Sequence, residues 1–134
     1  MFQDDSAYRA HLGDRMREKQ KILDLLFQTG MLPSHHPRNA AAIPELTGNL
    51  HYAIVGFLAS TPSALMLLSE EDLMKQPDQQ NLPGTTAQYP NWRHKTRFTV
   101  EGLRSDKEAK DFTGMYRNWL ARTGRGNSIS PQPT

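Results

Sequence analysis

Apolar residues recur at helical spacing near the start of the chain and predict one long amphipathic helix from Ser6 to about Thr29. Ser6 has the side chain of an N-cap. Gly30 suits the left-handed residue that follows a helix, and Pro33 bars further helix. The apolar positions of this stripe are Tyr8, Leu12, Met16, Leu23, Leu26 and Phe27.

A second, shorter helix is predicted after a proline-rich loop. Residues 31–48 hold three prolines and one short apolar run, which indicates a loop. Asn49 is the expected N-cap of the helix, and Pro62 ends it. Its apolar face is formed by Leu50, Ile54, Phe57 and Leu58.

The apolar run at 63–68 is typical of a strand that is buried on both faces. Such a strand needs neighbours, and no second convincing strand occurs in the chain. Either the run is helical or its neighbours belong to another part of a larger protein. The acidic residues 69–72 that follow predict the first turn of a short helix through Met74.

Residues 75 to about 96 predict a long irregular loop, a kind of segment that often carries function. A last helix begins at Ser105–Glu108, which has the pattern of a capping box. Gly124 and Gly126 end this helix, and residues 125–134 are predicted to be a flexible tail. Its inward residues are expected to be Ala109, Phe112, Met115 or Tyr116, Trp119 and Leu120.

Length and composition limit the classes that remain. The chain has 134 residues, which predicts one domain and leaves no room for a complete (β/α)8 barrel of about 250 residues. It has no cysteine, which excludes disulfides, a thiolate nucleophile and a cysteine-ligated zinc site. Its first residues have no pattern of a signal peptide, and its apolar runs are too short to span a bilayer, so we expect a cytoplasmic protein without membrane contact.

Several candidate chemical groups favour ordinary structural roles. Asp4–Asp5 and Glu70–Glu71 are sequence neighbours, which diverge around a helix instead of converging on one bond. His35–His36 lies in a proline-rich loop without a third metal ligand. The net charge of +2 does not favour nucleic acid, so the basic segment Arg93–Arg97 is best explained as solvated. We therefore predict no catalytic residues, no metal site and no cofactor.

Residues 81–93 stand apart because they combine Asn, Thr, Gln, Tyr, Trp and Arg with Pro and Gly. Carbohydrate sites pair an aromatic platform with amide and guanidinium groups, because sugars have flat C–H faces and many hydroxyls. Composition alone favours a structural loop over a sugar site.

The two motifs in this loop, Asn81–Thr86 (NLPGTT) and Tyr89–Arg93 (YPNWR), resemble the C-terminal signature of the 4-alpha-glucanotransferases, the amylomaltase or disproportionating-enzyme family. The likeness covers roughly residues 8–122. The sequence departs from the family near Ser69, where the family usually has Gln, and near Lys75, where it usually has Gly.

The resemblance implies a (β/α)8 barrel enzyme that transfers α-1,4-glucan segments between maltooligosaccharides. It implies an Asp nucleophile, a Glu acid/base and a second Asp, all upstream of the matched region. Residues 65–68 would be the last barrel strand, and the loop would lie at the sugar-binding mouth of the barrel. Arg93 would pin the loop to a carboxylate or a backbone carbonyl. The implied substrate-binding residues are Asn81, Pro83, Gly84, Thr85, Asn91, Trp92 and Arg93.

The sequence therefore predicts that residues 1–124 form one helical unit, the C-terminal segment of a glucanotransferase barrel. The fold is mainly α, with three to four helices and at most one short strand, which corresponds to the last βα portion of the barrel. We expect this segment to bind α-1,4-glucan, to lack glucan transfer alone, and to associate with the rest of the barrel or with itself through exposed apolar surface. The alternative is a non-enzymatic helical interaction module.

Overall fold

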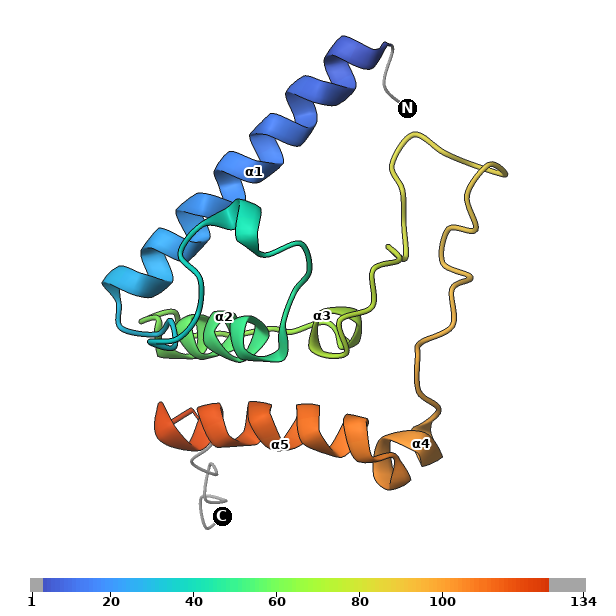
Figure 1. Ribbon diagram of the computed structural model, residues 1–134. Coiled ribbons are helices and arrows are strands. Elements are labelled where there is room, and N and C mark those ends of the chain that lie inside the picture. The colour runs from blue at the N-terminus through green and yellow to red at the C-terminus, as the bar shows by residue number, and fades with distance from the viewer. Residues whose placement is uncertain (1–3, 126–134) are drawn as a thin grey trace. The chain divides into compact units, whose positions relative to one another are not determined.

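The computed structural model describes residues 4–125. The chain divides into two compact units, Met1–Thr61 and Pro62–Thr134. That residues 1–124 act as one helical unit stays a prediction, and all of the predicted tail except Arg125 lies outside the described residues. The elements in chain order are α1 (Asp5–Gln28), the 3-10 helix η1 (Ala40–Ala42), α2 (Gly48–Ser60), α3 (Glu70–Leu73), α4 (Val100–Ser105) and α5 (Lys107–Arg122) (Figure 1).

Both long helices of the first unit begin slightly before the predicted position. The N-cap of α1 is Asp4, not Ser6, and the N-cap of α2 is Thr47, not Asn49. Each capping side chain accepts a hydrogen bond from the backbone N–H three residues later, at 2.7 and 3.2 Å. In both cases another capping residue lies two positions before the predicted one, and its side chain satisfies one of the free N–H groups of the first turn.

Helix α1 ends at Gln28, and Gly30 follows its C-cap Thr29 in a left-handed conformation, as predicted, with φ +70°. The N–H groups of Gly30 and Met31 donate to the carbonyl oxygens of Phe27 and Leu26, at 3.0 and 2.8 Å. This pair of hydrogen bonds is the Schellman motif, in which the residue with positive φ is usually glycine.

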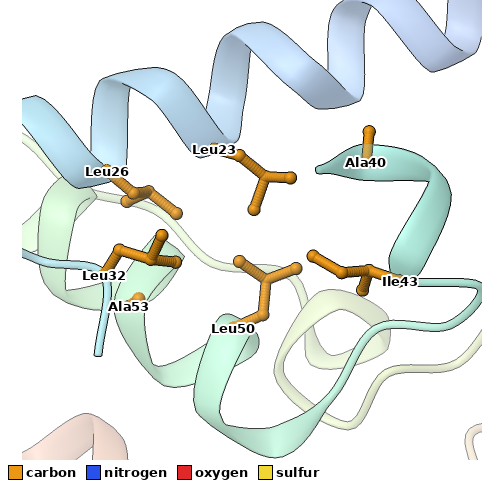
Figure 2. Packing of buried hydrophobic residues seen from close by; sticks show 7 residues of the cluster. All are labelled: Leu23, Leu26, Leu32, Ala40, Ile43, Leu50 and Ala53. Atoms are coloured by element: carbon orange, nitrogen blue, oxygen red, sulfur yellow. The ribbon is translucent and has the colours of Figure 1, made fainter. Parts of the chain in front are cut away.

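The core of the first unit is a cluster of apolar side chains contributed by α1, η1, α2 and the loop between them. Figure 2 shows these side chains pointing toward one another. Met31, Ile54 and Phe57 pack against the cluster and are partly buried. Its members are Leu23, Leu26, Leu32, Ala40, Ile43, Leu50 and Ala53.

Polar side chains of α1 hold the proline-rich loop over this core. The Gln20 side chain donates to the carbonyl oxygen of Arg38 at 2.8 Å and accepts from the backbone N–H of Ala40 at 2.9 Å. The Lys19 ammonium donates to the carbonyl oxygen of Ile43. These bonds satisfy backbone groups of an irregular segment that has few partners of its own.

The first half of α1 is amphipathic but is not covered. Tyr8, Leu12 and Met16 follow the predicted stripe, yet all three are exposed, and the buried residues of α1 are Leu23 and Leu26. The reason is that η1 and α2 lie beside the C-terminal half of α1, whereas its N-terminal half extends past them (Figure 1).

In the second unit, residues 63–68 form neither a strand nor a helix, and the residues that the structure describes contain no strand. Leu65 and Leu67 are 81% and 89% exposed. A strand requires a neighbour to pair its backbone N–H and C=O groups. The part of the chain that is described provides no such neighbour.

The short acidic helix predicted next is α3. The Ser69 hydroxyl caps it by accepting from the N–H of Asp72 at 3.1 Å. It ends in a second Schellman motif, in which Lys75 and Gln76 N–H groups donate to the carbonyl oxygens of Asp72 and Glu71, at 3.3 and 2.8 Å. The residue with positive φ is here Lys75, with φ +54°.

The region after the loop differs from the prediction in two respects. Helix α4 was not predicted, because its central Gly102 weakens the helical pattern of a six-residue segment; the Thr99 hydroxyl caps it by accepting from the Gly102 N–H at 3.0 Å. Helix α5 is capped by Asp106, not Ser105, and the Asp106 carboxylate accepts from the Ala109 N–H at 3.1 Å. Ser105 is instead the last residue of α4.

The mainly α fold is confirmed, with five α-helices among residues 4–125 instead of three to four. Ala109 and Trp119 of α5 are buried, and the other residues predicted to face inward there are half-buried. Gly124 follows α5 with φ +74°, whereas Gly126 lies outside the described residues. None of the helices between residues 4 and 125 is both long and apolar enough to cross a bilayer. The cytoplasmic location stays a prediction.

Candidate functional site

The long loop predicted from the sequence joins α3 to α4 without a helix (Figure 1). Its two ends are tied together at the base. The Gln76 side chain donates to the carbonyl oxygen of Lys95 at 3.3 Å and accepts from the N–H of Arg97 at 3.1 Å. The Arg97 guanidinium donates to the carbonyl oxygen of Met74 at 3.4 Å and forms an ion pair with Glu108. The loop is therefore anchored to both α3 and α5.

The first motif folds as a tight turn over Leu82–Thr85. The N–H of Thr85 donates to the carbonyl oxygen of Leu82 at 3.3 Å, and the Thr85 hydroxyl donates to the same oxygen at 2.7 Å. Pro83 occupies the second position and Gly84 the third, with φ +78°. Proline followed by a residue with positive φ is the signature of a type II turn, which explains why Pro and Gly stand here.

The second motif also forms a turn, but a tryptophan takes the position that favours glycine. The N–H of Arg93 donates to the carbonyl oxygen of Pro90 at 3.0 Å, which makes Trp92 the third residue of the turn. Trp92 has φ +59°. A left-handed conformation costs a residue with a Cβ about 1–2 kcal/mol, and such conformations cluster at functional sites.

The side-chain amide of Asn91 connects the two turns. Its Oδ1 accepts from the N–H of Leu82 at 2.7 Å. Its Nδ2 donates to both the carbonyl oxygen and the hydroxyl of Thr85, at 3.1 and 2.9 Å. The next residue, Trp92, donates its N–H to the carbonyl oxygen of Gln80 at 2.7 Å. Residues 91–92 are thus held against residues 80–85 by side-chain and backbone bonds.

Two ring side chains of the loop, Tyr89 and His94, pack against each other. The Tyr89 hydroxyl donates to the carbonyl oxygen of Gln79 at 2.6 Å, and its ring packs against His94 with 5.1 Å between centroids and a tilt of 47°. The His94 Nε2 is buried and finds no hydrogen-bond partner among the described residues. In contrast, the Trp92 side chain is 75% exposed.

The seven residues implied as substrate-binding all lie in these two turns and beside them. The exposed ones are Asn81, Pro83, Gly84, Trp92 and Arg93. Thr85 and Asn91 are half-buried, because their side chains bond to each other within the loop.

Sequence reasoning missed the residues that anchor the loop. We expected Arg93 to anchor the loop. The structure shows the anchoring contacts at Arg97 instead, which bonds to the carbonyl oxygen of Met74 and pairs with the carboxylate of Glu108. No local pattern marks Arg97, because its partners are far away in the sequence. Gln76 and Tyr89 are likewise recognisable only once the loop is folded.

A polar cavity of about 310 Å³ lies beside the loop, between α3 and the residues that follow it. The pKa of Glu71 in its wall is lowered from the ordinary value, chiefly by a hydrogen bond from its own backbone N–H, then by bonds from the side chains of Gln80 and Ser69 that outweigh its slight burial. The cavity is lined by Ser69, Glu71, Asp72, Gln76, Pro77, Asp78, Gln79 and Gln80.

The other candidate groups of the sequence have structural positions. Asp4 caps α1, and Glu70 and Glu71 lie in the acidic turn of α3. His36 is buried, with Nδ1 3.0 Å from the carbonyl oxygen of Pro37 and Nε2 3.2 Å from the hydroxyl of Thr47, the N-cap of α2. Between residues 4 and 125, His, Asp and Glu side chains form no group of three that could hold a metal ion.

Comparisons with known proteins point to one family. The family model of 4-alpha-glucanotransferase matches residues 3–100, which is more than half of the chain. A curated 4-alpha-glucanotransferase from Haemophilus influenzae is 31% identical over 101 residues. That similarity covers 73% of this chain but 14% of the relative, so the chain spans a small part of the length of the protein it matches. Both turns of the loop lie inside the residues matched by the family model.

Proposed function

Because this chain belongs to the 4-alpha-glucanotransferase family, we propose that its loop at residues 81–93 is a binding surface for α-1,4-linked glucan. The bound ligand would be a maltooligosaccharide or the end of a longer glucan. In the whole protein this surface would serve the transfer of glucan segments between such acceptors.

The observation that carries this proposal is the outward-facing Trp92 within an ordered polar loop. An indole that is 75% exposed offers a flat apolar face, which matches the C–H face of a glucose ring. Asn81 and Arg93 are exposed in the same loop and offer amide and guanidinium donors for sugar hydroxyls. Pro83, Gly84 and Thr85 supply the turn that shapes this surface.

We propose that the chain supplies sugar binding without the chemistry of transfer. The resemblance implies three catalytic acids upstream of the matched region, and two of the carboxylates near the loop already have partners. Glu108 pairs with Arg97, and Glu71 bonds with the Gln80 side chain. Incubation of maltotriose with the chain alone should therefore leave it intact. The appearance of glucose and maltopentaose would contradict this.

The exposed leucines of the second unit support association with the rest of a barrel. Leu65 and Leu67 present apolar side chains to solvent in a segment that forms no strand. Next to the other strands of a (β/α)8 barrel, this segment would find both backbone partners and apolar cover. We propose that the remaining part of such a barrel is its partner, and that the chain alone self-associates through the same residues.

A titration with maltotriose tests the glucan site. In a proton–nitrogen correlation spectrum, the indole N–H of Trp92 should shift in a saturable way, whereas that of the buried Trp119 should stay in place. Cellotriose is the matched control, because it has the same composition with the other anomeric linkage. A well-dispersed spectrum in which the Trp92 signal does not respond to maltotriose would contradict the proposal. An equal response to cellotriose would mean that the loop binds sugars without selecting the α-1,4 linkage.

A non-enzymatic interaction module remains the second candidate, and the first unit favours it. The exposed stripe of Tyr8, Leu12 and Met16 on α1 is one open apolar surface. A cavity of about 320 Å³ lies further along this helix, and both apolar and charged residues of α1, α2 and the segment 44–46 line it. Under this alternative, Trp92 would not respond to sugar, and a partner protein would bury the stripe.

A further inference from the structure

We propose that Asn91 is a positioning residue, whose side-chain amide fixes the Leu82–Thr85 turn and thereby sets the direction of the neighbouring Trp92 indole. The inference rests on the proposed function for the identity of the ligand. Its geometric part rests only on the hydrogen bonds of the loop.

The side-chain amide of Asn91 forms its hydrogen bonds with other residues of the loop. Its oxygen accepts from the N–H of Leu82 at 2.7 Å, and its nitrogen donates to the carbonyl oxygen and the hydroxyl of Thr85 at 3.1 and 2.9 Å. An asparagine side chain has two N–H donors and one acceptor oxygen. Both donors therefore have partners in the loop, and Asn91 has no free N–H to offer a sugar hydroxyl.

The same contacts determine how Trp92 is presented. Trp92 follows Asn91 directly, its N–H donates to the carbonyl oxygen of Gln80 at 2.7 Å, and its φ is +59°. A tryptophan keeps such a backbone conformation only when its surroundings impose it. Two sets of hydrogen bonds hold the positive φ of Trp92. One joins Asn91 to the Leu82–Thr85 turn, and the other is the bond from the Arg93 N–H to the carbonyl oxygen of Pro90.

Release of the Asn91 amide should allow residue 92 to return to negative φ. Because the Cα–Cβ bond turns with the backbone, the indole would then leave its present direction even though no atom of Trp92 has been changed. Asn91 would thus influence sugar binding through Trp92, without touching the sugar.

The substitution Asn91→Asp separates positioning from bulk. Aspartate has nearly the same shape and keeps the acceptor for the Leu82 N–H. It loses both donors and places a carboxylate oxygen against the carbonyl oxygen of Thr85. Asn81→Asp is the matched control for loop geometry, since it makes the same change of charge on an exposed side chain of the same loop.

Two measurements on the 134-residue chain test the proposal. The first is the intraresidue amide–Hα NOE of Trp92 in the free protein, which is strong at positive φ. We expect Asn91→Asp to lose it and Asn81→Asp to keep it. The second is the affinity for maltotriose, which Asn91→Asp should weaken about tenfold or more, equivalent to about 1.4 kcal/mol.

Acid provides a signature that general destabilisation of the loop would not give. The introduced carboxyl should be protonated as the pH falls through and below about 4, near the ordinary aspartate pKa. It then has an O–H donor for the Thr85 carbonyl oxygen. The affinity of Asn91→Asp relative to the unchanged protein should recover there. A loop that was merely loosened would bind no better at low pH.

The outcomes distinguish this inference from the proposed function. If Asn91→Asp keeps the Trp92 NOE, or if Asn81→Asp loses it equally, the positioning role is overturned. Weaker binding without recovery in acid also overturns it. If the unchanged protein fails to bind maltotriose while only Asn91→Asp loses the NOE, the positioning of Trp92 is supported and the glucan function fails.

Discussion

The two units are held together by different kinds of interaction. The first unit, Met1–Thr61, gathers side chains from α1, η1 and α2 into one apolar cluster (Figure 2). In the second unit, the loop between α3 and α4 is held by polar bonds such as those of Asn91 and Arg97. Leu65 and Leu67, which precede this loop, remain exposed.

This contrast indicates which segment lacks packing partners among the residues that the structure describes. The apolar residues of the proline-rich loop pack against helices of the same unit, so the first unit buries them without another part of the protein. The apolar run at 63–68 has the composition of a buried strand without the neighbours of one. We attribute this to the barrel that the family membership leads us to propose.

The largest expected effect is the loss of a core side chain in the first unit. Leu26→Ala should lower the free energy of unfolding by about 2–5 kcal/mol, because it removes a fully buried leucine and leaves a cavity. Leu67→Ala, at an 89% exposed position, should change it by less than about 0.5 kcal/mol when the chain is monomeric. Urea titrations of both variants, at protein concentrations too low for self-association, measure the difference. Equal effects would mean that Leu67 is buried within the monomer, and the contrast between the units would not hold.

The next effect concerns the Schellman motif that closes α1. Gly30→Ala should destabilise the protein by about 1–2 kcal/mol, because alanine is strained at φ +70°. The cost is purely conformational, since a Cβ built at Gly30 meets no atom within 4 Å. Thermal unfolding followed by circular dichroism measures it. Gly48→Ala, in α2 and also without a nearby atom, is the control, and it should be neutral or stabilising.

In the Schellman motif that ends α3, in the second unit, a change at the residue with positive φ should stabilise the protein instead. Lys75 has φ +54° at the end of α3, a conformation that favours glycine. Lys75→Gly should therefore stabilise by about 1 kcal/mol or less, because relief of backbone strain is offset by loss of the contact between the Lys75 ammonium and the Phe112 ring, 5.4 Å from its centroid.

The variant Lys75→Ala resolves the two contributions to this change. It keeps the strain and loses the contact with Phe112, so it should be less stable than the unchanged protein. Thermal unfolding of both variants provides the comparison. If Lys75→Gly and Lys75→Ala are destabilised alike, the contact dominates and the backbone strain is small.

The two units also differ in how well the sequence predicts them. Helical spacing located α1, α2 and α5, and Gly30 marked the end of α1, because these signals are local. The N-caps were misplaced by one or two residues, because a second suitable capping residue lies near each predicted one. Asp4 and Thr47 lie two residues before the predicted caps, and Asp106 lies one residue after. Helix α4 escaped because a six-residue segment with a central glycine has too weak a pattern.

The candidate site was predicted as a set of residues but not as an arrangement. The motifs placed Asn81, Trp92 and Arg93 in one polar loop. They did not show that Asn91 faces inward or that Arg97 anchors the base, because both depend on partners brought close by folding. The positive φ of Trp92 runs against the preference of its residue type, so no propensity could have indicated it.

The smallest expected effect is the pH dependence contributed by Glu71, which belongs to the polar unit alone. Hydrogen bonds from its own backbone N–H and from Gln80 lower its pKa in the folded protein. A carboxyl with a lowered folded pKa stabilises the protein above its unfolded pKa, and this contribution is lost as the pH falls through the folded value. Because Glu71 is only half-buried and solvent screens its charge, the effect should be slight. Carbon NMR of its carboxyl should show a titration midpoint below that of an ordinary glutamate, and Gln80→Ala should raise it.

The apolar cluster of the first unit has no titrating group, so Leu26→Ala should leave this midpoint unchanged. A midpoint that moves with Leu26→Ala but not with Gln80→Ala would mean that the core, and not the local polar bonds, controls Glu71.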